Sequence, residues 1–162
     1  FLVLATPLYF DNISGMLKVY MDRLVVMGDP RFEENLKGDS RHVKPANQVA
    51  PKLFMISSCG FPERSQFQVI THWADRVAYH MHTEVIGEIY TPQASLLTAN
   101  AEGLEPIISD YLKNVEIAGK EVVTDMKVSP ETEESLCQKF IPDEMYIQEA
   151  NRNFDQILKG AI

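Results

Sequence analysis

Two aromatic side chains, Tyr9 and Phe10, lie in a short polar segment near the start of the chain, where they could stack on a planar ligand. Asn12 and Ser14 follow in the same segment and offer hydrogen bonds to the polar edge of such a ligand or to a phosphate. The purely structural alternative is a strand that ends at Pro7 and a capped helix that begins at Ser14. Composition alone favours that alternative, but it leaves two aromatic rings in a loop where the chain itself need not cover them.

A second candidate segment is Ser58-Cys59-Gly60, which follows an apolar run. A glycine lets backbone N–H groups approach a flat ligand closely, and such donors can stabilise negative charge on it. The structural alternative is that Gly60 only permits a tight turn with positive φ. Cys59 is less favoured as a redox nucleophile, because no resolving cysteine is near and no basic residue adjoins it until Arg64.

Each segment follows an expected strand. Residues 1–5 form an unbroken apolar run, which predicts a strand buried on both faces. Ser14 is expected to cap a helix over 14–27 that ends at Gly28, with Leu17, Tyr20 or Met21, and Leu24 facing inward. In open α/β sheets ligands bind at the carboxyl ends of the strands, so this arrangement favours a small-molecule site.

The remaining pattern predicts alternating strands and helices. Residues 29–51 are polar and without sustained periodicity, which predicts a long loop. Ser129 and Pro130 are typical of a helix start. We expect strands at 52–57 and 84–90, an amphipathic helix over 64–82, and helices at 103–127, after Pro130, and at 143–159. Parallel strands separated by helices indicate an α/β protein.

Both candidate segments resemble motifs of a known family. The first contains Thr6, Pro7, Tyr9, Gly15, Leu17, Lys18, Asp22 and Arg23, and the second reads Ser57-Ser58-Cys59-Gly60-Phe61-Pro62-Glu63. Together they resemble the flavodoxin-like NAD(P)H-dependent FMN reductases and the related iron–sulfur flavoproteins. The similarity extends to about Pro92. It implies a flavodoxin-like, doubly wound parallel sheet, with a core over 1–102 and an acidic helical extension over 103–162.

The resemblance also implies a cofactor and its contacts. In that family both loops wrap the isoalloxazine ring of FMN. The residues carried over to the cofactor site are Thr6, Pro7, Leu8, Tyr9, Phe10, Asn12, Ser14, Ser58, Cys59, Gly60 and Phe61. The family places the phosphate loop upstream, and no Gly/Ser-rich strand-to-helix loop is found in this sequence. We therefore expect the chain to be the C-terminal portion of a longer protein, with a sheet that is incomplete at its N-terminus.

The activity implied is that of an FMN-dependent oxidoreductase, which passes electrons from NAD(P)H to a flavin, quinone, azo or nitro compound. No side chain stands out as a catalytic acid or base, and a homodimer or homotetramer is expected. Two alternatives stay open. One is an electron-transferring iron–sulfur flavoprotein, which requires cluster cysteines upstream of Phe1. The other is a flavin-free interaction module of the same fold.

Charge and cysteine usage narrow the function classes. The chain has 162 residues and a formal net charge of −8, and residues 101–162 hold 13 acidic against 6 basic side chains. This excess of negative charge opposes contact with nucleic-acid phosphates, which are also negative. Two distant cysteines, Cys59 and Cys137, suit a reducing cytoplasm, and no apolar run approaches the length of a membrane span. The three histidines at 72, 80 and 82 lack the spacing of a metal site and are expected at the surface or at a helix end.

Overall fold

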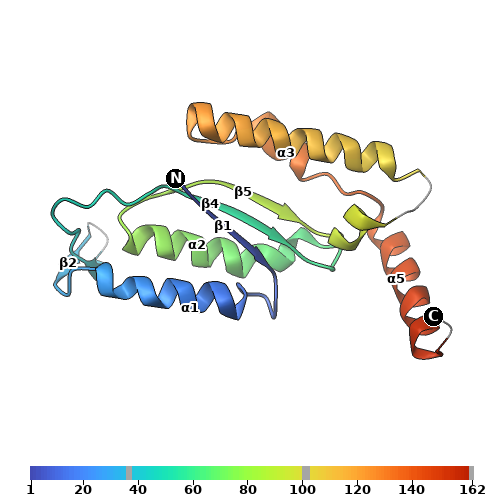
Figure 1. Cartoon of the computed structure of the whole chain (residues 1–162), viewed down its shortest axis with the longest axis horizontal. Coiled ribbons are helices and arrows are strands. Elements are labelled where there is room, and N and C mark those ends of the chain that lie inside the picture. Colours follow the sequence, from blue (N-terminus) through green and yellow to red (C-terminus); the bar gives the residue numbers. More distant parts are fainter. Residues whose placement is uncertain (36–37, 100–102, 161–162) are drawn as a thin grey trace.

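The centre of the fold is a parallel three-stranded sheet (Figure 1). The computed structural model describes residues 1–35, 38–99 and 103–160. Its sheet contains β1 (Leu2–Pro7), β4 (Leu53–Ser58) and β5 (Val85–Thr91) in the order β1-β4-β5. Both strand pairs are parallel, so the three predicted strands are confirmed. With five α-helices in the described part of the chain, the protein is of the α/β class.

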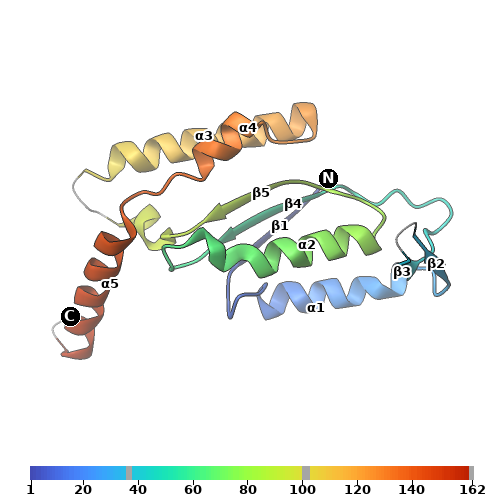
Figure 2. The ribbon, with the colours of Figure 1, turned by 180° about the vertical axis from the view of Figure 1, so that it is seen from behind.

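Helices cover the sheet from both sides, as Figures 1 and 2 show. On one side lie α1 (Gly15–Arg23) and α2 (Gln68–His80), and on the other α3 (Glu105–Asp125) and α4 (Pro130–Leu136). The core beneath α1 and α2 contains Leu4, Met55, Phe67, Ile70, Ala74 and Tyr90. The core beneath α3 and α4 contains Phe54, Ile89, Tyr111, Val122 and Leu136.

The expected helix caps are present. Ser14 accepts a hydrogen bond from the N–H of Leu17, and Ser129 accepts one from the N–H of Thr132. Leu17 and Met21 pack toward the core, whereas Tyr20 is half exposed. Two predicted helices are shorter than expected, because η1 (Leu24–Met27) and η2 (Arg64–Phe67) are 3-10 turns that extend α1 and precede α2.

The prediction that the first strand is buried on both faces is wrong. Leu4 is buried, but Phe1 and Val3 are 48% and 44% exposed. In the described part of the chain β1 is an edge strand, and the core beneath α3 and α4 includes residues of β4 and β5 but none of β1. An apolar run therefore did not distinguish a strand covered on two faces from one covered on a single face.

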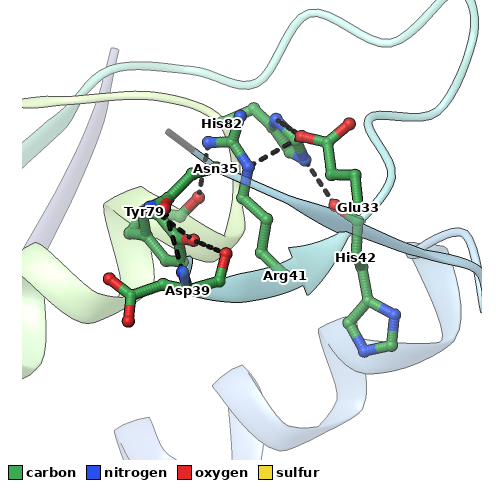
Figure 3. Close-up of polar contacts among 7 residues, drawn as sticks. All are labelled: Glu33, Asn35, Asp39, Arg41, His42, Tyr79 and His82. Atoms are coloured by element: carbon green, nitrogen blue, oxygen red, sulfur yellow. Dashed lines mark hydrogen bonds and ion pairs between the residues drawn. The ribbon is translucent and has the colours of Figure 1, made fainter. Parts of the chain in front are cut away.

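The predicted loop at 29–51 contains a small antiparallel hairpin. Its strands are β2 (Phe32–Glu34) and β3 (Ser40–His42). Figure 3 shows how the hairpin attaches to the end of α2: Nε2 of His82 donates to the carbonyl of His42 at 2.7 Å, and Tyr79 donates to the carbonyl of Asp39 at 3.2 Å. Strands of three residues held by such distant contacts leave no periodic pattern in the sequence.

A last helix, α5 (Asp143–Leu158), projects from the end of the molecule toward which the three strands point (Figures 1 and 2). A 3-10 turn, η3 (Ala94–Thr98), lies near its start. Tyr146 is the buried residue of α5, while Phe154 and Leu158 are largely exposed. The domain boundary predicted at residue 102 lies outside the described residues. No described helix is both long and apolar enough to cross a membrane.

Candidate functional site

The two candidate loops meet at one edge of the sheet. Pro7 is paired with Ser58 in the parallel register of β1 and β4. One residue further, the N–H of Leu8 donates to the carbonyl of Ser58 at 3.0 Å. The prediction that both loops follow neighbouring strands at their carboxyl ends is therefore confirmed, and this edge is where α/β sheets bind ligands.

The first loop turns sharply at Phe10 and Asp11. Tyr9 and Asn12 exchange backbone hydrogen bonds of 3.0 and 3.1 Å, and the two residues between them have φ of 48° and 59°. Positive φ at two non-glycine residues is unfavourable, and such strain concentrates at functional sites. The turn holds both aromatic rings outward, with Tyr9 64% exposed and Phe10 fully exposed.

Two side chains predicted to contact a ligand, those of Thr6 and Asn12, make hydrogen bonds within this loop. Thr6 is buried, and its Oγ1 accepts from the N–H of Ser14 at 2.9 Å and donates to the carbonyl of Pro7 at 3.0 Å. Oδ1 of Asn12 accepts from the N–H of Ile13 at 2.8 Å. Their oxygens therefore shape the loop, and the outward groups are the rings of Tyr9 and Phe10.

Cys59 anchors the second loop. It is buried, its N–H donates to the carbonyl of Thr91 at 3.0 Å, and its thiol contacts the carbonyl of Phe61 at 3.7 Å. Burial raises the pKa of the Cys59 thiol above its ordinary value. A thiol with a raised pKa is a poor nucleophile at neutral pH, so these contacts favour a structural role for Cys59.

Gly60 is open to approach from outside. Its φ is not positive, so the suggested positive-φ turn is wrong, and a Cβ added there meets no atom within 4 Å. Within the described part of the chain, the N–H groups of Gly60 and Phe61 donate to no protein acceptor. The ring of Phe61 is 57% exposed. A flat ligand rich in hydrogen-bond acceptors could therefore reach both backbone donors and one aromatic ring.

Sequence reasoning missed Tyr146 and Gln93, which contact the second loop, and Ser95, which contacts Tyr146. Tyr146 donates to the carbonyl of Gly60 at 2.6 Å and shares a hydrogen bond of 2.9 Å with Ser95. Gln93 is fully buried, and its N–H donates to the carbonyl of Phe61 at 2.8 Å. Tyr146 lies 86 residues from Gly60, so no local signal could have indicated this contact.

A groove of about 400 Å³ lies between α2 and β5, which is an edge strand in the described part of the chain. It is lined in part by Arg64, Thr71, Glu88 and Tyr90, and these residues bind one another. Tyr90 and Thr71 donate to the carboxylate of Glu88 at 2.8 and 3.3 Å, and Arg64 donates to the carbonyl of Tyr90 at 2.9 Å. Charged side chains of this kind protect a sheet edge from pairing with another chain.

Glu88 should make stability depend on pH. Burial raises its pKa above the ordinary value of a glutamate, and the hydrogen bonds from Tyr90 and Thr71 oppose that shift. The carboxyl group of Glu88 therefore holds its proton more tightly in the folded protein than in the unfolded chain. As a result, the contribution of Glu88 to the free energy of unfolding falls as pH rises above about 4.3. We expect the free energy of unfolding of Glu88→Gln, minus that of the wild type, to increase with pH until Glu88 is fully ionised in the folded state. Urea unfolding at a series of pH values measures this difference, and a constant difference would contradict the assignment.

The structure places the three histidines at 72, 80 and 82 on or just after α2. His72 and His80 are exposed, whereas the side chain of His82 is 8% exposed and lies in the contacts of Figure 3. Across residues 1–35, 38–99 and 103–160, no group of three or more His, Cys, Asp or Glu side chains is arranged to hold a metal ion. His82 has φ of 55° and follows the last turn of α2, so it ends that helix in a left-handed conformation.

No family model, no curated protein and no solved structure was found to match this chain.

Proposed function

We propose that the protein has a flavodoxin-like fold, binds the isoalloxazine ring of FMN between residues 6–12 and 58–61, and acts as an NAD(P)H-dependent oxidoreductase. One observation carries the proposal. Exposed aromatic rings, and backbone N–H groups that find no protein acceptor among the described residues, gather on two adjacent loops at the carboxyl ends of β1 and β4. The sequence resemblance to flavodoxin-like FMN reductases supports the same assignment independently of this geometry.

The residues at this edge fit an isoalloxazine ring. Tyr9, Phe10 and Phe61 offer aromatic surface for stacking, with exposures of 64%, 104% and 57%. The open space outside Gly60 leaves room for a flat group to lie close to the backbone. Thr6 and Ser14 hold the shape of the first loop through the 2.9 Å hydrogen bond between them.

When bound, FMN supplies the redox chemistry by accepting a hydride or electrons from NAD(P)H and passing them to a small acceptor. The protein's part is to orient the ring and adjust its charge. The N–H groups of Gly60 and Phe61 are fixed donors that would stabilise negative charge on the polar edge of the ring. Because a fixed donor needs little reorganisation, this contribution does not require a catalytic acid or base among the side chains.

The visible absorption spectrum of the purified protein, with and without added FMN, tests the assignment. A flavin band perturbed by the protein, with NAD(P)H oxidised in the presence of a quinone, supports the proposed oxidoreductase. A flavin band accompanied by broad cluster absorption favours the iron–sulfur flavoprotein. No perturbation of the FMN band at all favours the flavin-free module.

A further inference from the structure

The C-terminal segment is attached directly to the second loop of the proposed flavin site. Tyr146, in the first turn of α5, is 7% exposed and its hydroxyl donates to the carbonyl of Gly60 at 2.6 Å. A phenol has one proton to donate, so Ser95 is the donor in the second contact, at 2.9 Å between its Oγ and the Tyr146 oxygen. The buried hydroxyl therefore has both a donor and an acceptor partner.

Gln93 makes a second attachment beside the first. It is fully buried and adopts a left-handed conformation with φ of 53°. Its side-chain amide pairs with the backbone of Ile141, with Nε2 donating to the carbonyl at 2.9 Å and Oε1 accepting from the N–H at 3.3 Å. Its own N–H donates to Phe61. The segment that leads into α5 is thus held against the same loop at two points.

These contacts fix the direction of the backbone donors in the loop. In a trans peptide the C=O and the N–H of the next residue point in opposite directions. The carbonyl of Cys59 accepts from the N–H of Ala94, at the start of η3, at 2.9 Å, which turns the N–H of Gly60 away from η3. In the same way, the bond from Tyr146 to the carbonyl of Gly60 turns the N–H of Phe61 away from α5.

We propose that Tyr146 is a positioning residue for flavin binding: by holding the carbonyl of Gly60 it aims the N–H of Phe61 at the ring. This inference rests on the proposed function. It also makes the docking of α5 and the binding of FMN reciprocal, because each stabilises the same orientation of one peptide group. The acidic C-terminal extension is therefore part of the cofactor site.

The test compares Tyr146→Phe with Tyr20→Phe, a matched change on α1 where the ring is half exposed. Loss of one hydrogen bond at the loop should weaken FMN binding about threefold to tenfold in Tyr146→Phe and leave Tyr20→Phe like the wild type. Hydrogen exchange gives the second readout. FMN should slow the exchange of α5 amides in the wild type and in Tyr20→Phe, and much less in Tyr146→Phe.

The outcomes separate the inference from the proposed function. If Tyr146→Phe binds FMN as the wild type does and FMN still protects α5, Tyr146 serves packing alone and the inference is wrong, while the proposed function stands. If neither the wild type nor Tyr20→Phe binds FMN, the proposed function fails and the inference fails with it. Should Tyr146→Phe not fold, Ser95→Ala replaces it, because it removes the donor to the Tyr146 oxygen. A smaller loss of FMN affinity in Ser95→Ala supports the inference, and unchanged affinity overturns it.

Discussion

Replacing Phe67 with alanine is expected to lower the free energy of unfolding by about 3–5 kcal/mol, the usual cost of removing a buried phenylalanine. Phe67 is 1% exposed and stacks on Tyr90 with ring centroids 4.8 Å apart. It lies in the core between α2 and the sheet, next to Ile70 and Ala74. The truncation would leave a cavity that the surrounding residues cannot fill, and urea unfolding followed by circular dichroism measures the loss.

Phe61→Ala is the matched control for that variant. The ring of Phe61 is 57% exposed, so we expect its removal to change the free energy of unfolding by no more than about 0.5 kcal/mol. The affinity for FMN should fall instead, because Phe61 offers one of the rings on which the isoalloxazine would stack. Equal losses of stability in the two variants would show that Phe61 packs into the core and does not serve a ligand.

Gly60→Val is expected to weaken FMN binding by at least about tenfold, equivalent to about 1.4 kcal/mol, and to leave folding nearly unchanged. The φ of Gly60 is not positive, and the added Cβ would meet no protein atom within 4 Å. A branched side chain would fill the space through which a flat ligand reaches the N–H groups of Gly60 and Phe61. Fluorescence titration with FMN and thermal unfolding of the same sample measure the two effects.

Gly87→Val is a comparison variant that should lose stability, whereas Gly60→Val should lose FMN affinity. A Cβ at Gly87 would lie 2.7 Å from the ring of Phe54 and 2.8 Å from Val128, so this substitution overpacks the core beneath α3 and α4. Loss of stability in Gly60→Val without loss of FMN affinity would mean that Gly60 serves only the turn.

The sequence predicted the elements with strong local patterns. The three strands at 1–5, 52–57 and 84–90 and the caps at Ser14 and Ser129 were confirmed, because apolar runs and capping residues act within a few positions. The meeting of the two candidate loops followed from the parallel order of β1 and β4. Features that depend on distant partners were missed, such as the hairpin held by His82 and the exposed face of β1.

In the candidate site, too, features set by local sequence could be predicted and features set by distant contacts could not. Exposed aromatics at Tyr9 and Phe10 could be expected from their place in a polar loop, and both are exposed. The oxygens of Thr6 and Asn12 accept hydrogen bonds from N–H groups of the same loop. This depends on the shape of the turn at Phe10 and Asp11, which the composition of the loop does not specify. The contact between Tyr146 and Gly60 joins residues on α5 and after β4, and only the folded chain brings them together.

Titration of the protein with FMN, followed by flavin absorbance and fluorescence, tests the central claim most directly. The account predicts saturable binding with a dissociation constant below about 10 µM, equivalent to roughly 7 kcal/mol. Gly60→Val and Phe61→Ala should weaken this binding, and Glu88→Gln in the groove beside β5 should not. Absence of saturable binding at about 100 µM FMN, or an affinity that Gly60→Val leaves unchanged, would contradict a flavin site between these two loops.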